Sequence, residues 1–383
     1  MTAHWNGVHR VDAPMADGRT LRYYDEGGAG RVPPPDVRDL PVVEHGSVMR
    51  FDVLTGEWVT IAAHRMDRTF MPPADLCPLC PTRPGAEPSE IPADAYDVVV
   101  FDNRFPSFAP VTHGVMPAVD GDALWPQRPA EGQCEVVCFT SDHSAAFSAL
   151  PVERVRTVIE AWADRTAELS AMSGVEQVFL FENRGTEIGV TLQHPHGQIY
   201  AYPYVTPRTA QLLTRSGAHR QRTGRDLMED VLTSERKAAS RVVIDAAHWT
   251  AFVPAAARWP VEAHLVPHRA VPDLAALSGE ERDELAVVYR DLLGRLEGFF
   301  GPGGEDPPYI AAWHQAPVHT GRDLARLHLQ LFSLRRAPGK LKYLAGSESG
   351  MGAWVNDASP EGIAARLRDA APPPAAPRQV ARP

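Results

Sequence analysis

The stretch LQHPHGQIYAYPY, residues 192–204, constrains the fold most, because three polar side chains recur in it at every second position. His194, His196 and Gln198 are separated by a proline and a glycine, and an aromatic, apolar run follows. Alternate residues of an extended strand share one face, so these three side chains should point the same way. A strand end that happens to be polar is the plain alternative, so the chemistry has to be argued from other segments.

Composition sets the class of protein. The chain has 383 residues, of which 44% are hydrophobic and 22% charged, enough for about two domains of ~150 residues each. A formal net charge of −10 argues against a general nucleic-acid binder but leaves an anionic small substrate open. No apolar run approaches the ~18 residues of a membrane span, and the N-terminus lacks a signal-peptide core. We therefore expect a cytoplasmic protein that binds neither nucleic acid nor membrane, whose four cysteines are not a disulfide framework.

The chain divides into four expected segments. Residues 1–45 contain GGAGRVPPPDVRDLP and are expected to form a loose arm, and the Pro/Ala-rich tail 371–383 is expected to be disordered. Residues 46–215 and 216–370 share one order of elements: an apolar strand ending in histidine, a helix, and two further strands. This order indicates an ancient duplication with one active half and one degenerate half.

Two features of the second half can be read from its sequence. Its helix begins with Ser278 and Glu281, which are spaced as a capping box. Its last strand carries the degenerate form of the polar motif, so that H-x-H-x-Q in the first half corresponds to His328-x-Gln330-x-Phe332.

The segment DLCPLCP provides a possible metal site. Cys77 and Cys80 form a C-x-x-C, a spacing that lets both thiolates reach one tetrahedral metal ion. Two more ligands are needed, and His143, at the end of a strand, and His194 are the natural candidates. A redox pair or an incidental pair remains the alternative, although no thioredoxin-like context surrounds it.

If His194 binds metal, His196 is free for other chemistry. A neutral imidazole is a good nucleophile toward phosphorus at neutral pH. Gly197 would let a nucleotide phosphate approach the backbone, and Gln198 can donate to a phosphoryl oxygen as negative charge grows there. Further amide donors and backbone room for a phosphate are expected at Asn183, Gly185 and Gly189. The alternative is a purely structural role, which is usual for a single histidine on a strand. That role is less common for two alternate histidines followed by Gly-Gln.

These motifs resemble a known family. ENRG…GVTLQHPHGQIYAYP, together with DLCPLCP, SDH and RFDVLTGEWVTIAAHRMDR, is similar to the galactose-1-phosphate uridylyltransferases, the transferase branch of the histidine-triad superfamily. The resemblance runs from about Arg50 to Arg368. It implies an α+β fold built from a duplicated histidine-triad-like unit. In that fold an antiparallel sheet forms an open half-barrel with helices packed outside.

The resemblance also implies roles for individual residues. His196 would be the nucleophile that takes a uridylyl group from UDP-glucose, and Gln198 would hold the phosphoryl oxygens. Zinc would be bound by Cys77, Cys80, His143 and His194. Substrate contacts would come from Arg65, Arg68, Asn103, Arg104, Asn183, Gly189, Val190 and Thr191. The hexose would be reached by Lys342, Tyr343, Ser347 and Glu348 from the neighbouring subunit of a homodimer with shared active sites.

The implied reaction is ping-pong. UDP-glucose yields a uridylyl-His196 intermediate and glucose 1-phosphate, and galactose 1-phosphate then attacks to give UDP-galactose. Hydrolytic relatives carry a third histidine where this chain has Gln198. A sugar phosphate is a weakly basic leaving group that needs little help from a proton donor, so the glutamine favours transfer over hydrolysis.

Some members of the family carry a second metal, often iron. His314 and His328 occupy two of the corresponding positions, whereas Gln330 and Leu212 occupy the others. Leucine cannot bind a metal and a glutamine is a poor ligand at such a site, which argues against a second metal.

Two other functions remain open at this point. A sugar-nucleotide phosphorylase acting on ADP-glucose would keep the same nucleophile, glutamine and zinc ligands. The sequence does not indicate whether the bound base is uracil or adenine, so this function stays open. A non-catalytic zinc-binding module used for assembly is the alternative of a different class, and an intact His196 and Gln198 argue against it.

Overall fold

The computed structural model describes residues 3–5, 7–27, 30–42, 46–67, 71–111, 114–301 and 306–370. Arg68 and the expected tail 371–383 lie outside these ranges. The helices are α1 (Val152–Ser170), α2 (Pro207–Thr223), α3 (Leu227–Ala238), α4 (Gly279–Gly298), α5 (Gly346–Met351) and α6 (Pro360–Asp369).

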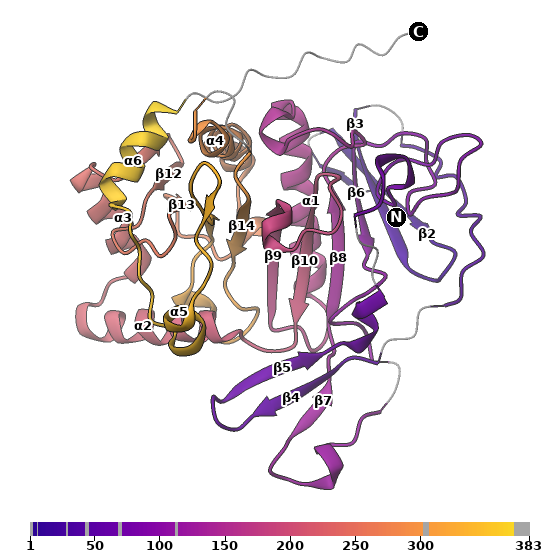
Figure 1. The fold of residues 1–383 in the computed structure, drawn as a ribbon, viewed down its shortest axis with the longest axis horizontal. Helices are drawn as coiled ribbons and strands as arrows, with labels where there is room; N and C mark the ends of the chain where they lie inside the picture. The colour runs from indigo at the N-terminus through magenta and orange to yellow at the C-terminus, as the bar shows by residue number, and fades with distance from the viewer. Residues whose placement is uncertain are drawn as a thin grey trace.

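In the described residues, twelve strands form one large sheet in which each neighbouring pair is antiparallel (Figure 1). In spatial order they are β1 (Ala3–Trp5), β2 (Val8–Pro14), β3 (Thr20–Glu26), β6 (Val98–Asp102), β8 (Gln133–Cys138), β10 (His196–Tyr202), β9 (Gln177–Arg184), β14 (Tyr309–His314), β15 (His328–Ser333), β13 (Val261–Pro267), β12 (Trp249–Phe252) and β11 (Val242–Asp245). Within the described residues β1 and β11 are the two edges, so the sheet does not close into a barrel. The expected mixture of helices with an antiparallel sheet is confirmed.

Two smaller sheets accompany the large one in the part of the chain that the structure describes. One consists of β5 (Glu57–Ile61), β4 (Val48–Asp52) and β7 (Gln127–Pro129), and it projects beside the large sheet (Figure 1). The other pairs β16 (Arg335–Ala337) with β17 (Lys340–Leu341).

The expectation of a loose arm over residues 1–45 is wrong for its first part. Strands β1, β2 and β3 extend the large sheet at one end, and Leu21 and Tyr24 of β3 pair with Phe101 and Val98 of β6. The sequence pattern missed them because the Gly/Pro-rich stretch that follows dominates the composition of this segment. Residues 30–42 contain no helix or strand.

The two long helices cover one face of the large sheet. α1 contacts α4 as well as β3, β6 and β9, while α4 contacts β12. The main hydrophobic core lies between these helices and the sheet, where Val100, Val137, Leu180 and Ile199 are fully or almost fully buried. Because side chains alternate along a strand, their sequence neighbours face away from the helices, and the polar motif belongs to that other face.

The start of α4 confirms the expected capping box. Ser278 accepts a hydrogen bond from the backbone N–H of Glu281, and the carboxylate of Glu281 accepts one from the backbone of Ser278. Both bonds satisfy N–H groups that would otherwise lack a partner in the first turn.

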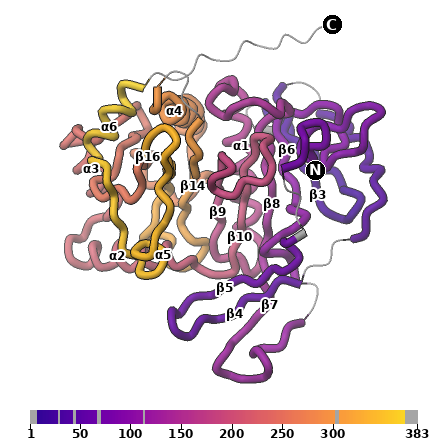
Figure 2. The backbone as a smooth tube through the Cα atoms, viewed as in Figure 1, coloured from indigo at the N-terminus to yellow at the C-terminus, as the bar shows by residue number. Residues whose placement is uncertain are grey.

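The middle of the sheet has a mirrored strand order. From the β9–β14 junction outward, one side reads β9-β10-β8-β6 and the other β14-β15-β13-β12. Figure 2 shows the chain running from the N-terminal strands at one side to the C-terminal elements at the other. Histidines open the two matching strands β10 and β15, and each directs Nδ1 to the carbonyl oxygen two residues earlier. By this match His328 corresponds to His196 and Gln330 to Gln198. The sequence pattern aligns His328 with His194 instead, so the structure shifts that alignment by two residues.

None of the helices in the described part of the chain is both long and apolar enough to cross a bilayer.

Candidate active site

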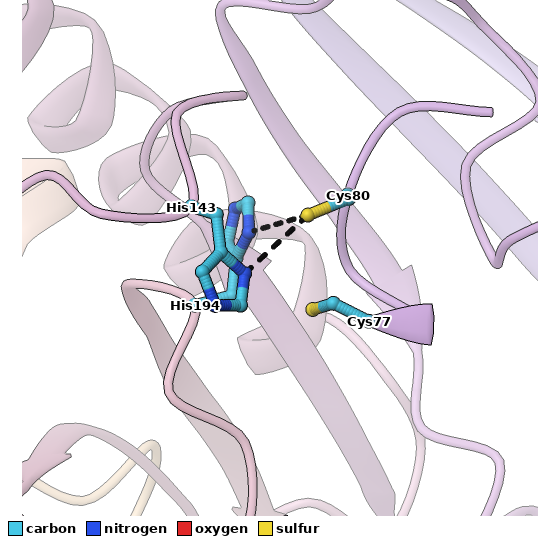
Figure 3. Close-up of side chains that lie close together, drawn as sticks. All are labelled: Cys77, Cys80, His143 and His194. Atoms are coloured by element: carbon cyan, nitrogen blue, oxygen red, sulfur yellow. Dashed lines mark hydrogen bonds between the residues drawn. The ribbon is translucent and has the colours of Figure 1, made fainter. Parts of the chain in front are cut away.

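A four-residue cluster of sulfur and nitrogen ligands lies beside the start of β10 (Figure 3). Cys77 and Cys80 come from the loop that follows a short helical turn, His143 from the loop after β8, and His194 from the turn before β10. Their ligand atoms all lie within 4.8 Å of one another. Figure 3 shows the two cysteines facing the two imidazoles across a common centre. The structure thus brings together the four residues that the sequence nominated.

The distances suit a tetrahedral metal ion. Sγ of Cys80 lies 3.4 Å from Nδ1 of His143 and 3.5 Å from Nδ1 of His194. A tetrahedral zinc with typical bond lengths places its sulfur and nitrogen ligands about 3.6 Å apart. Burial and the adjacent Cys77 raise the pKa of the Cys80 thiol to about 12, so thiolates at this position need a bound cation. The donor set therefore fits one metal ion.

His194 is arranged as a ligand by its surroundings. Its Nε2 lies 2.8 Å from the carbonyl oxygen of Thr140 and 2.8 Å from the hydroxyl of Tyr96. A carbonyl oxygen can only accept, so Nε2 carries the hydrogen and the lone pair of Nδ1 faces the cluster. Burial lowers the pKa of His194 to about 4, which keeps the ring neutral as a metal ligand requires.

His196 is oriented by the same segment. Its Nδ1 donates a hydrogen bond to the main-chain carbonyl oxygen of His194, at 2.7 Å, which leaves the lone pair on Nε2. Burial lowers the pKa of His196, so the ring is neutral near pH 7. The residue that contributes to the metal cluster therefore also holds the neighbouring imidazole in one tautomer and one orientation.

A cavity of about 440 Å³ opens in front of His196. Its floor is the sheet face opposite α1 and α4, where Phe101 of β6, Val136 of β8, Gln198 of β10 and Phe181 of β9 lie opposite one another across the strands. Gln198 and His196 share this floor, as alternate residues of one strand should. The volume is that of a small-molecule site, and polar side chains such as Arg65, Asn103 and Asn183 line it together with the apolar ones.

Most of the substrate contacts expected from the sequence line this cavity. They are Arg65, Asn103, Arg104, Asn183, Gly189, Val190, Thr191 and Gln198. The guanidinium of Arg65 donates a hydrogen bond to the carbonyl oxygen of Phe105 at 2.7 Å, which holds the side chain in place. Arg68 lies outside the described residues.

The expected hexose contacts do not line the cavity within this chain. The buried amine of Lys342 contacts the carbonyl oxygen of Val355 and the carboxylate of Glu348, the latter at 3.3 Å, while Tyr343 is 71% exposed. Ser347 donates to the carbonyl oxygen of Ala353. Their expected role depends on a neighbouring subunit and stays a prediction.

The structure places Gly197 differently from the sequence interpretation. A side chain at this position would meet the ring of Phe139 at 2.9 Å and the carbonyl oxygen of Phe181 at 3.1 Å. Gly197 pairs with Val137, whose side chain lies in the core under the helices. Its missing side chain therefore makes room for packing on the helix side, and not for a phosphate, because neighbouring residues of a strand face opposite ways.

Sequence reasoning missed several lining residues. Phe101, Val136 and Phe181 could have been found, because they occupy the alternate positions of strands whose other face is apolar. Glu90 and Leu79 had no such signal, since they come from an irregular loop.

The two histidines at the doubted second metal site are not arranged around a shared ion. The rings of His314 and His328 are stacked, with centroids 4.8 Å apart and planes 11° from parallel. Ring nitrogens carry their lone pairs in the ring plane, so stacked rings do not direct them to a common point. The amide of Gln330 is engaged with Glu262 at 2.7 Å, and Nδ1 of His328 with the carbonyl oxygen of Arg326.

Comparison with known proteins agrees with this geometry. Residues 42–206 match the family described as galactose-1-phosphate uridyl transferase, N-terminal domain, and residues 213–368 match the corresponding C-terminal domain. The galactose-1-phosphate uridylyltransferase of Streptomyces lividans is 45% identical, over 95% of this chain and 98% of its own. That of Thermotoga maritima is 34% identical, over 84% and 98%. A solved uridylyltransferase structure superposes with a TM-score of 0.74 at 32% identity, covering 84% of this chain and 98% of that one. With a Cys2His2 cluster, an oriented histidine and both domain matches in one chain, this protein belongs to the galactose-1-phosphate uridylyltransferase family.

Proposed function

We propose that the protein transfers a uridylyl group from UDP-glucose to galactose 1-phosphate through a covalent intermediate on His196. The observation that carries the proposal is the hydrogen bond from Nδ1 of His196 to the carbonyl oxygen of His194. It leaves a neutral Nε2 as the nucleophilic atom of a residue that lines the cavity.

In the first half-reaction Nε2 of His196 attacks the α-phosphorus of UDP-glucose. The bond from phosphorus to the bridging oxygen breaks, and that oxygen leaves with glucose 1-phosphate. The amide of Gln198 is on the same strand face and can donate to a non-bridging oxygen as charge develops. Backbone N–H groups around Gly189 and the amide of Asn183 line the same cavity and suit a second phosphate.

In the second half-reaction a phosphate oxygen of galactose 1-phosphate attacks the uridylyl phosphorus. The bond between phosphorus and Nε2 breaks, and UDP-galactose and the free imidazole are formed. Both leaving groups, a sugar phosphate and an imidazole held by a hydrogen bond, depart without a third histidine as acid.

The Cys77, Cys80, His143 and His194 cluster would hold zinc, the ion that a tetrahedral Cys2His2 set favours. Bound there, zinc would serve as a structural ion that fixes the loop of His194. The carbonyl oxygen of His194 then fixes the ring of His196, so the metal site acts on the chemistry by positioning.

Larger-scale features are part of the proposal. The mirrored strand order supports a duplicated histidine-triad-like unit with an open half-barrel, whose halves are residues 46–215 and 216–370. We further propose that the protein is a homodimer in the cytoplasm. In this dimer the hexose bound to one subunit would be reached from the other by Lys342, Tyr343, Ser347 and Glu348.

Intact-mass spectrometry after mixing with UDP-glucose tests the reaction. The wild-type protein should gain one uridylyl group, and the adduct should disappear when galactose 1-phosphate is added. His196→Ala should give no adduct. His319→Ala is a matched control, because this histidine is exposed and does not line the cavity, and its adduct should equal that of the wild type.

The same experiment separates the competing functions. An adenylyl adduct with ADP-glucose, lost on addition of phosphate, would favour a sugar-nucleotide phosphorylase. No adduct with either sugar nucleotide, in protein with bound metal, would favour a non-catalytic metal-binding module and overturn the proposal.

A further inference from the structure

The cavity has two chemically different ends. At one end Leu79 of the metal loop, Phe101 of β6 and Val136 of β8 belong to one apolar cluster. β9, two strands away from β8 across β10, brings Asn183 to the other end, and the backbone of residues 188–191 also lines the cavity. The second end suits phosphate groups, and the apolar end suits the flat face of a base.

A charged pair stands at the apolar end. The backbone N–H of Glu90 donates to the carbonyl oxygen of Pro78, which sets Glu90 directly beside the metal loop. Its carboxylate lies 3.7 Å from the guanidinium of Arg104, two residues after β6. The guanidinium of Arg104 also lies over the ring of Phe105. A nucleoside whose base fills the apolar end would meet this pair with its polar edge or its ribose.

The N-terminal extension, residues 1–41, precedes the residues that match the family's N-terminal domain, and its side chains contact Glu90. The carboxylate of Glu90 lies 2.5 Å from the guanidinium of Arg19 and 3.1 Å from that of Arg38. Each arginine is anchored in turn within the extension, Arg19 by Asp17 at 2.8 Å and Arg38 by Asp36 at 2.7 Å. Glu90 is 7% exposed, so these contacts are made largely out of water, where charge-assisted bonds are strong.

The extension also lines a second cavity, which adjoins the substrate cavity. This neighbouring cavity, of about 530 Å³, is lined by residues 37–40 of the extension and by the metal loop, and it shares Pro78, Glu90 and Arg104 with the first. The side chains of Glu90 and Arg104 therefore lie between the two cavities. Ionic contacts hold them in place there.

We propose that the N-terminal extension positions the nucleoside end of the active site: Arg19 and Arg38 fix Glu90, and Glu90 fixes Arg104 against the nucleoside of the sugar nucleotide. This inference rests on the proposed function. Glu90, Arg19 and Arg38 are positioning residues, and Arg104 is the group that meets the substrate.

Steady-state kinetics with both substrates tests the inference. Arg38→Gln and Arg104→Gln should each raise KM for UDP-glucose about tenfold, the effect of losing one charged hydrogen bond. Their kcat should stay within about twofold of wild type. KM for galactose 1-phosphate should not change, because the nucleoside is already covalently held when this substrate binds.

The matched control is Arg31→Gln. Arg31 lies in the same extension and pairs with Asp25 at 2.5 Å, but it has no contact with Glu90 and does not line the cavity. Its KM for UDP-glucose should equal that of the wild type. The double variant Arg38→Gln/Arg104→Gln should be no worse than Arg104→Gln alone, because both changes act through one contact.

Three results would overturn the inference: an unchanged KM for UDP-glucose in Arg104→Gln, fully additive effects in the double variant, or equal effects of Arg31→Gln and Arg38→Gln. Arg104 is 40% exposed at its side chain, so its substitution does not threaten folding. If wild-type protein forms no uridylyl adduct, the proposed function fails instead, so the two failures are distinguishable.

Discussion

At the scale of single residues, the turn and strand over residues 194–198 direct their side chains into three different environments. The side chain of His194 enters the metal cluster, His196 and Gln198 face the cavity, and Gly197 between them faces the helix-covered core. The period of two along β10 separates Gly197 from His196 and Gln198. His194 lies in the turn before the strand and does not share their face, contrary to the expectation from the sequence.

Gln198 should matter for the chemical step. Gln198→Asn shortens the side chain by one methylene, so its amide no longer reaches the same oxygen. We expect single-turnover formation of the uridylyl adduct to slow about a hundredfold, as when one oxyanion donor is removed. Rapid-quench measurements with saturating UDP-glucose check this, and an unchanged rate would show that Gln198 is not a donor in the transition state.

Gly197 should matter for stability. Gly197→Ala places a methyl group 2.9 Å from Phe139 and 3.1 Å from the carbonyl oxygen of Phe181, so the fold must shift to accept it. We expect a loss of about 1–3 kcal/mol in the free energy of unfolding, measured in urea. Gly217→Ala in α2 is the control, because its nearest contact would be 3.7 Å away and alanine favours helices. Equal stabilities of the two variants would contradict the packing role of Gly197.

At the scale of elements, the junction of β9 and β14 joins the two halves of the sheet. Glu182 of β9 is buried there and accepts a hydrogen bond from the hydroxyl of Tyr309 on β14, at 2.9 Å. Its second carboxylate oxygen has no partner. Burial raises the pKa of Glu182 from 4.5 to about 7, with Arg184 opposing the shift.

This raised pKa predicts a pH-dependent stability. Between pH 4.5 and about 7 the folded protein holds a proton that the unfolded chain has released, so the free energy of unfolding falls as pH rises through this window. Glu182→Gln cannot ionise and should lose that slope. At pH 8 we expect it to be more stable than wild type by on the order of 2 kcal/mol, and at pH 5 to show little advantage. Urea unfolding at both pH values checks this, and parallel pH profiles would exclude Glu182 as the source.

At the scale of the whole molecule, the metal cluster connects segments that are far apart in the chain. The loop of Cys77 and Cys80, the loop of His143 and the turn of His194 have no continuous secondary structure in common. A bound ion would link them and would stabilise the fold by its binding free energy.

Metal removal should therefore lower both stability and activity. Treatment with a strong chelator should reduce Tm by several degrees and slow adduct formation on His196, and added Zn²⁺ should restore both. Cys77→Ser should start with the lower Tm and respond little to chelator. Cys134→Ser, which changes a buried cysteine outside the cluster, should keep the full response. A chelator effect of the same size in Cys77→Ser would place the responsible metal elsewhere.

Local patterns in the sequence were sufficient to predict several elements of the fold and most of the chemically active residues. The capping box of α4 and the strand positions of β8, β9 and β10 follow from short-range spacing, which acts over one turn or one strand. The four cluster residues and the pair His196 and Gln198 could be nominated because their chemistry is uncommon and their spacing regular.

Only the tertiary structure decided where those patterns meet. Glu90 enters the cavity from an irregular loop, β1–β3 join a distant sheet edge, and Gly197 faces the core instead of the substrate. The stacked rings of His314 and His328 depend equally on how β14 lies against β15. The sequence by itself determined which residues have the chemistry for transfer through a histidine. Strand register, ion pairs between remote segments and the burial of each face then determined how those residues are oriented, because such contacts leave no local signal along the chain.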